Sequence, residues 1–268
     1  AVGAGWHRWS LYWDMVERGG AGAFDWRAAD GIVARDVAAD LRPLVILQGT
    51  PARYATGGVP WAPVPEVGGG TRDEVVALDA PGPVALESSP PGSLDAAIFL
   101  AADGSGTDDP AGAVAINPGN PWARFVGAAV ARYRPGGELA RVASWPAGVG
   151  VRTWEVGNEP NLRHFWSGTP GQFARLLEVA YLTIKWLDPG ATVVHGGIAD
   201  ASGAATWYGR FLSALRDRAE VSPLPEAHGF YFDAAAWHWY AYPDRLASGP
   251  VTVRQLLAAH GIPAKPIW

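Results

Sequence analysis

Cysteine is absent from this chain of 268 residues, and methionine occurs once, at Met15. Without cysteine the chain can form no disulfide and offers neither a thiolate metal ligand nor a cysteine nucleophile. Charge is also scarce: Asp, Glu, Lys and Arg make up 18% of the residues, against about 25% in an ordinary soluble domain. The formal net charge is −5, so no basic field that would attract nucleic acid is predicted.

Long hydrophobic runs are missing as well. No apolar stretch approaches the roughly 18 residues of a membrane-spanning helix. The first residues of the chain lack the charged start and apolar stretch of a secretion signal. The sequence therefore predicts no membrane partner. It leaves the location, secreted or cytoplasmic, and the oligomeric state open.

Apolar and aromatic residues are plentiful by contrast. Hydrophobic residues make up 49% of the chain, enough to build a core, and the length suits one large domain. The 14 tryptophans are unusual, because an indole is costly to expose unless its flat face is used. Between residues 57 and 121, Pro-Gly, Pro-Pro and Gly-Gly steps follow one another closely. We expect an insertion there, either a functional loop or a small subdomain.

Outside this insertion, predicted strands and helices alternate. Strands are predicted at residues 7–13, 44–48, 151–157, 192–197 and 232–240, with another beginning at 266–268. Helices are predicted at residues 27–39, 122–133, 171–187, 204–219 and 252–260. Such alternation is typical of βαβ units around a parallel sheet. Within the insertion, short strands are predicted at residues 75–78, 96–100 and 113–116.

The fold class predicted from this alternation is α/β, with residues 1–268 as one domain. An open doubly wound sheet that binds a nucleotide would carry a glycine-rich turn between an early strand and a helix. The run Gly68–Gly70 follows no strand and precedes no clear helix, so the sequence does not favour a nicotinamide enzyme. A closed eight-stranded barrel needs two strands more than the six predicted.

The most informative segment runs from Trp154 to Asn161. Its strand is predicted to end near Gly157, which places Asn158 and Glu159 at the carboxyl end of the strand, where barrel enzymes carry catalytic groups. Pro160 directs the chain out of the sheet. A carboxylate held there beside an amide suits a general acid. The alternative is a solvated turn glutamate with an asparagine cap.

This segment resembles the Trp-Glu-x-x-Asn-Glu-Pro motif of clan A glycoside hydrolases. Other segments are similar to family 39 in the same order; they are His7–Trp13 with Val16-Glu17, Phe24–Trp26, Asn161-Leu162, Phe165-Trp166, Asp188-Pro189 and Trp237–Tyr240. The resemblance covers nearly all of the chain outside residues 57–121. It implies a (β/α)8 barrel of the β-xylosidase and α-iduronidase type, incomplete here, running from about the second strand to the start of the seventh.

The resemblance also implies roles for single residues. Glu159 matches the general acid/base, and Asn158 matches the amide that holds the sugar 2-hydroxyl. Arg8 matches an arginine close to the nucleophile, and His238 and Tyr240 match a His-x-Tyr pair on the sixth strand. The residues alone leave other interpretations open. Arg8 is also a candidate ion-pair partner of Glu155, which is predicted to be a structural carboxylate below the site. His238 and Tyr240 are also candidates for side chains that line the core.

The partner implied is an oligosaccharide or another glycoside. Trp166 is the best candidate for stacking on a sugar ring, ahead of Trp61 and Trp122, with ordinary packing as the alternative. No cofactor is implied. No metal is predicted either, because the six histidines lack zinc-ligand spacing and residues 103–109 lack the closing glutamate of a calcium loop.

The second carboxylate of a retaining glycosidase is not found by the resemblance. In clan A it is a glutamate that follows a stretch like Lys265–Trp268, so we expect it beyond Trp268. Three explanations remain open. The chain is a fragment, which its single internal Met15 favours, or it is a shortened sugar-binding relic without activity. In the third, another carboxylate substitutes; the candidates are Asp14, Glu17 and Asp233.

Overall fold

The computed structural model describes residues 3–56, 88–240 and 246–268. Its centre is a parallel sheet with strand order β1-β2-β6-β7. The strands are β1 (Trp6–Tyr12), β2 (Arg42–Gln48), β6 (Thr153–Val156) and β7 (Thr192–His195). The run of apolar residues in β2 is buried along almost its whole length, as expected for a central parallel strand covered on both faces. The predicted α/β class and parallel sheet are confirmed.

Beyond β7 the parallel order continues through shorter pairings. Val194 bridges to Ala234, β8 (Ile198–Ala199) pairs with β9 (Trp237–His238), and Ala235 bridges to Ile267. The predicted strand at residues 232–240 is thus reduced to two bridges and the two-residue β9. Residues 266–268 join the sheet by hydrogen bonds to Ala235 and Trp237, as predicted.

A closed barrel is not observed. Among the described residues, no strand pairing joins β1 to the segment 266–268. The two outer strands nevertheless approach each other, since the rings of Trp6 and Trp268 meet edge to face with centroids 5.5 Å apart. The sheet therefore curves without closing, and the strand numbering implied by the barrel stays a prediction.

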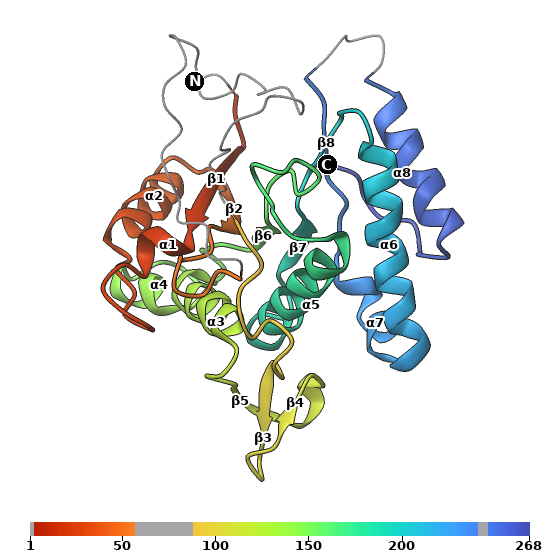
Figure 1. Ribbon diagram of the computed structural model, residues 1–268. Coiled ribbons are helices and arrows are strands. Elements are labelled where there is room, and N and C mark those ends of the chain that lie inside the picture. Colours follow the sequence, from red (N-terminus) through yellow and green to blue (C-terminus); the bar gives the residue numbers. More distant parts are fainter. Residues whose placement is uncertain (1–2, 57–87, 241–245) are drawn as a thin grey trace.

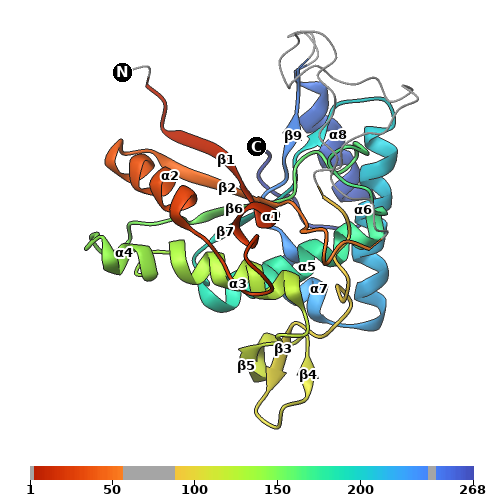
Figure 2. The same cartoon turned by 60° about the vertical axis from the view of Figure 1, so that its left-hand side comes forward.

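The predicted helices are confirmed, each within a few residues at its ends. The long ones are α2 (Arg27–Ala38), α3 (Pro121–Tyr133), α5 (Pro170–Leu187), α6 (Ala204–Val221) and α8 (Ser248–Ala259); the short ones are α1 (Trp13–Val16), α4 (Glu138–Val142) and α7 (Leu224–Ala227). Side chains of Asn120 and Thr169 cap α3 and α5, each followed by a proline in the first turn. Figures 1 and 2 show the long helices along the outside of the sheet. None of the described helices meets the length and apolarity needed to cross a bilayer.

Much of the tryptophan is used in packing. Trp13, Trp122 and Trp154 are almost completely inaccessible to solvent. Trp13 stacks on Phe125 of α3 and lies against Trp122. These large side chains join the sheet to the helices below it, so the tryptophan excess reflects core volume in the first place.

Residues 99–116 form a separate lobe. It is a small antiparallel sheet of order β4-β3-β5, made of β3 (Phe99–Ala101), β4 (Gly106–Thr107) and β5 (Ala113–Ile116), with the short 3-10 helix η1 (Pro110–Gly112). It projects away from the parallel sheet in both views (Figures 1 and 2). The strand predicted at 113–116 is confirmed, and the one at 96–100 is shifted toward the carboxyl end. The strand predicted at 75–78, Gly68–Gly70 and Trp61 lie outside the described residues. The boundaries 57–121 and 1–268 stay predictions.

One arginine of α5 attaches the lobe to the body. Arg175 is 4% exposed, and it donates to the carbonyl oxygens of Leu94 and Ala96 at 3.1 and 2.9 Å. It also pairs with Asp108 at 2.8 Å. Among the described residues, no cluster of three or more potential ligands that could hold a metal is found.

Candidate active site

The turn after β6 is held in an unusual backbone conformation. Gly157 has φ +73°, and a side chain there would meet the ring of Phe173 at 2.9 Å. Glu159 has φ +42°, a left-handed conformation that costs an ordinary residue about 1 kcal/mol or more. Strained residues of this kind persist where the surroundings fix them, and they cluster at functional sites. The side chain of Glu159 is thereby kept at the carboxyl end of β6, largely buried at 8% exposure.

Glu159 is joined to β9. The Nδ1 atom of His238 lies 2.9 Å from Oε1 of Glu159. The loop after Glu159 is attached to the same pair of strands, because the side chain of Asn161 both donates to and accepts from the backbone of Ala199 in β8 at 3.0 Å. Since β8 pairs with β9, these bonds fix the distance between Glu159 and His238. Asn161 belongs to the motif, which predicts no role for it.

Arg8 links β1 to β6. Its Nε and one terminal nitrogen donate to the two carboxylate oxygens of Glu155 at 2.7 and 2.9 Å. The same terminal nitrogen donates to Oδ1 of Asn158 at 2.8 Å. Burial acts to lower the pKa of Arg8, but the hydrogen bond and the charge of Glu155 outweigh it and hold this pKa above its ordinary value.

Arg8 forms the ion pair with Glu155 that was the alternative expectation, and it also orients the amide of Asn158. Its place close to a nucleophile stays a prediction. With Oδ1 of Asn158 turned toward Arg8, the nitrogen of that amide is directed elsewhere and is able to donate to another acceptor. Glu155 is 1% exposed, in line with its predicted structural role.

Tyr240 and Trp166 lie in contrasting surroundings. Tyr240 is 85% exposed, so it does not line the core, and its ring lies edge-on to His238 at 6.4 Å. Trp166 is only 3% exposed and packs edge to face on Phe173, while its indole nitrogen donates to the carbonyl oxygen of Thr169. The expectation that Trp166 offers a face to a sugar is not met, because packing covers it. Trp122 is likewise buried and donates to Leu176.

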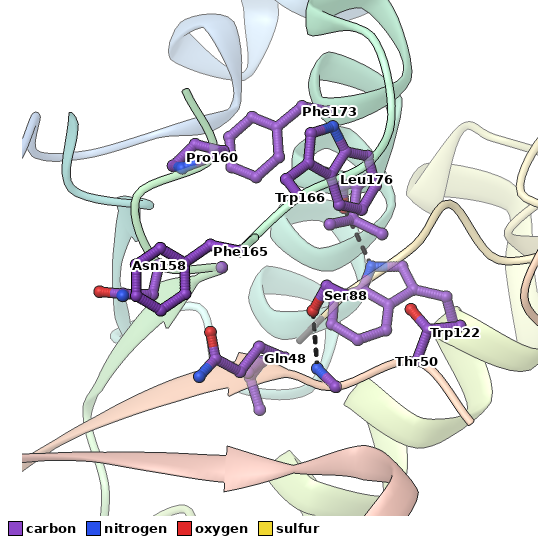
Figure 3. A pocket seen from close by; sticks show the side chains of 13 residues that line it. Gln48, Thr50, Ser88, Trp122, Asn158, Pro160, Phe165, Trp166, Phe173 and Leu176 are labelled. Atoms are coloured by element: carbon purple, nitrogen blue, oxygen red, sulfur yellow. Dashed lines mark hydrogen bonds between the residues drawn. The ribbon is translucent and has the colours of Figure 1, made fainter. Parts of the chain in front are cut away.

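A small cavity lies beside Asn158, between the ends of β2 and β6 (Figure 3). Its volume is about 10 Å³, room for about one water molecule. Its lining includes Gln48, Thr50, Ser88, Phe165 and Trp166. It is far too small for the sugar ring that the resemblance leads us to expect.

Two further histidines lie close to the site and were not predicted. Burial lowers the pKa of His164, and the charge of Glu159 opposes this effect. His195, at the end of β7, is completely buried, and burial lowers its pKa to about 4. Its Nδ1 lies 2.9 Å from the carbonyl oxygen of Gly196, which fixes that nitrogen as the donor, and Nε2 then accepts from the hydroxyl of Tyr208 at 3.1 Å. His195 is therefore neutral at pH 7. No sequence motif distinguishes either histidine.

The three carboxylates considered as substitutes for the missing nucleophile differ in their surroundings. Glu17 is completely buried and pairs with Arg124 at 2.9 Å. Asp233 pairs with Lys185 at 2.8 Å and accepts from the backbone of Val193, at the opposite end of its segment from His238. Asp14 lies at the carboxyl end of β1 beside Gly49, and burial raises its pKa. Of these three, Asp14 is the one for which no ion pair is found with another described residue.

Neither a protein-family model nor a curated protein matches this chain. Among solved structures, it is similar to a glucosidase from Croceicoccus marinus, with a TM-score of 0.50 and 16% sequence identity over 92% of this chain and 38% of that one. A family 39 β-xylosidase from Caulobacter crescentus gives a TM-score of 0.49 and 20% identity over 92% of this chain and 40% of the other. The catalytic domain of a family 53 protein from Ignisphaera aggregans gives 0.46 and 14%, over 99% and 56%.

This chain thus spans about two-fifths of the length of the glucosidase and of the β-xylosidase. At these identities the likeness to the glucosidase establishes a shared fold and no more. The fold is of the glycosidase type, an α/β arrangement with a parallel sheet at its centre.

Proposed function

We propose that this chain carries the acid/base side of a retaining glycoside hydrolase related to family 39, with Glu159 as the general acid/base. The observation that carries the proposal is the placement of Glu159. It lies at the carboxyl end of a parallel strand, on a left-handed backbone, with an imidazole nitrogen 2.9 Å from its carboxylate. The motif around it and the glycosidase-type fold support the same reaction class.

In the proposed reaction, Glu159 gives its proton to the glycosidic oxygen as the bond to the sugar breaks. A second carboxylate attacks the anomeric carbon and forms a glycosyl ester. Glu159, now ionised, then takes a proton from water, and the resulting hydroxide attacks the ester and releases the sugar. His238 would hold the Glu159 carboxyl group in one orientation, while Asn158, set by Arg8, would donate to the sugar 2-hydroxyl.

The second carboxylate is the open part of this proposal. A retaining mechanism needs it about 5–5.5 Å from Glu159. By resemblance we propose a glutamate beyond Trp268. Asp14 is the alternative within this chain, since it lies on the same edge of the sheet and forms no ion pair within the part of the chain that the structure describes.

The test is turnover of aryl glycosides by the full-length protein. Glu159→Gln is expected to lower kcat/KM at least ~100-fold for poor leaving groups and much less for good ones, because only poor leaving groups need the proton. Glu226→Gln is the matched control, because this glutamate is exposed and pairs with Arg216 on the surface. Unchanged hydrolysis of a poor leaving group by Glu159→Gln contradicts the proposal. The turnover of Asp14→Asn then decides whether the nucleophile is Asp14 or a glutamate beyond Trp268.

The second candidate function is carbohydrate binding without turnover. It is favoured by the engagement of Glu17 and Asp233 in ion pairs away from Glu159. Calorimetric titration with oligosaccharides, next to the chromogenic assay, separates the two functions. Binding without any turnover, even of the best leaving groups, would identify the chain as a binding module.

A further inference from the structure

A glycine between β7 and β8 lies directly against His238. A Cβ atom on Gly197 would stand 2.0 Å from Nε2 of His238 and 2.4 Å from its Cδ2. Contacts this short do not occur between real side chains, so an alanine at position 197 must displace the imidazole or the backbone. Only a residue without a side chain lets His238 occupy its present place.

The same glycine is held from its other side. The backbone N–H of Gly197 donates to Oε1 of Glu155 at 2.9 Å. That carboxylate is fixed in turn by the two bonds from Arg8. Gly197 therefore cannot retreat from the imidazole without losing a buried charge-assisted hydrogen bond.

The imidazole is thus confined between two groups. Its Nε2 edge faces Gly197, and its Nδ1 edge faces Glu159, 2.9 Å from Oε1. We propose that Gly197 is a positioning residue for Glu159. Because it carries no side chain, its backbone leaves room for the His238 ring and keeps the ring against the carboxyl group of Glu159. We call this close contact between Gly197 and His238 the seat. The positioning role of Gly197 rests on the proposed acid/base role of Glu159, whereas the contact between Gly197 and His238 does not depend on it.

The contact with His238 fixes the direction in which the carboxyl group of Glu159 offers its proton. A hydrogen bond from a fixed ring to one carboxylate oxygen stops the carboxyl group from rotating, so that its proton is offered along one direction. Other charged or titratable groups also face this pair. They are Arg8 on β1, Glu155 on β6, His164 in the loop after β6, His195 on β7 and Tyr240 beyond β9. The contact between Gly197 and His238 sets the strength of the interaction between His238 and Glu159 in the presence of these other groups.

The primary test measures that coupling without substrate. The imidazole signals of His238 are titrated by NMR in the otherwise unchanged protein and in Glu159→Gln, and the difference between the two midpoints is the coupling. In a Gly197→Ala background this difference is expected to fall by more than half. An unchanged difference overturns the proposal.

Gly196→Ala is the matched control. A Cβ atom on Gly196 would meet the carbonyl oxygens of Val156 and Gly157 at 2.7 and 2.8 Å, so this variant also strains the turn but presses on backbone rather than on the ring. We expect it to keep the coupling. Loss of the coupling in Gly196→Ala as well would mean that any disturbance of the turn suffices, and it would overturn the specific role of Gly197.

A second measurement stays informative if Gly197→Ala folds poorly. Removing the ring with His238→Ala should relieve the clash, so the double variant should regain thermal stability relative to Gly197→Ala alone. The same ring removal should not rescue Gly196→Ala. Equal destabilisation by Gly197→Ala with and without the ring contradicts the seat.

Turnover separates this inference from the function it builds on. If Glu159 is the acid, Gly197→Ala loses more activity on poor than on good leaving groups, whereas Gly196→Ala loses similar activity on both. Intact NMR coupling with no turnover of any glycoside would disprove the glycosidase function and leave the seat standing. Turnover that depends on Glu159 but not on Gly197 would support the glycosidase function and contradict the positioning role of Gly197.

Discussion

Glu17 and Glu159 are two buried glutamates that follow parallel strands on the same edge of the sheet, and their surroundings differ. Glu17 accepts from Arg124, from the hydroxyl of Tyr54, from the indole of Trp13 and from the backbone of Gly22. Glu159 contacts His238, and it lies next to Asn158, which is partly exposed. Burial alone therefore does not mark a reactive carboxylate.

The difference lies in what surrounds each carboxylate. Four donors around Glu17 stabilise its charge and leave no room for a ligand, which suits a carboxylate that holds the turn after β1 in place. Glu159 instead has a left-handed backbone and, among the described residues, one hydrogen-bonded contact, with His238. A strained backbone of this kind is typical of functional sites. The four variants below test this contrast.

The largest effect is expected for Glu17→Gln. The substitution removes the charge that pairs with Arg124 and turns one acceptor into a donor among buried donors. We expect a loss of about 3–4 kcal/mol in the free energy of unfolding, measured by urea denaturation. A loss below about 1 kcal/mol would show that the Glu17 cluster is not a structural anchor.

His195 should make stability depend on pH. Because its pKa falls from 6.5 to about 4 on folding, the unfolded chain binds a proton in this interval that the folded chain does not. The contribution is complete above pH 6.5 and is lost as the pH falls toward 4, by about 2 kcal/mol at pH 5. His195→Gln should flatten this slope in urea melts between pH 7 and 5. An identical slope in the variant would contradict a neutral buried His195.

Asn161→Ala should have a smaller effect on stability and a larger one on the site. Two hydrogen bonds to the backbone of Ala199 are lost, which costs about 1–2 kcal/mol. The loop that carries Glu159 is then no longer attached to β8. We expect the NMR coupling between His238 and Glu159 to weaken with only a modest change in melting temperature. Asn117→Ala, directly after the lobe, is the comparison, because it also removes hydrogen bonds to backbone groups but far from the site.

The smallest stability effect is expected for Glu159→Gln. Glutamine keeps the shape, the backbone conformation and an acceptor for His238, so the free energy of unfolding should change by less than about 1 kcal/mol. The same urea assay serves for both glutamates. If Glu159→Gln cost as much as Glu17→Gln, the distinction between an anchoring and a reactive carboxylate would be lost.

Much of the local structure could be read from residue order. Alternating apolar strands and helices predicted the parallel sheet, and the caps at Asn120 and Thr169 agree with the predicted starts of α3 and α5. The motif predicted that Glu159 lies at the end of a strand. The prediction that failed was the solvent exposure of Trp166. Its indole is the same whether it faces solvent or packs on Phe173, and only the tertiary packing decides between the two.

The succession of strands and helices along the chain, the helix boundaries and the place of Glu159 after a strand follow from local periodicity and from proline and glycine positions, because these act between neighbours in the chain. The contacts that give Glu159 its surroundings join residues far apart: Arg8 to Glu155, Asn161 to Ala199, and His238 to both Glu159 and Gly197. Such contacts depend on which strands lie side by side and on how closely their backbones approach. These contacts form only when the chain folds, and they distinguish Glu17, which anchors a turn, from Glu159, for which we propose a catalytic role.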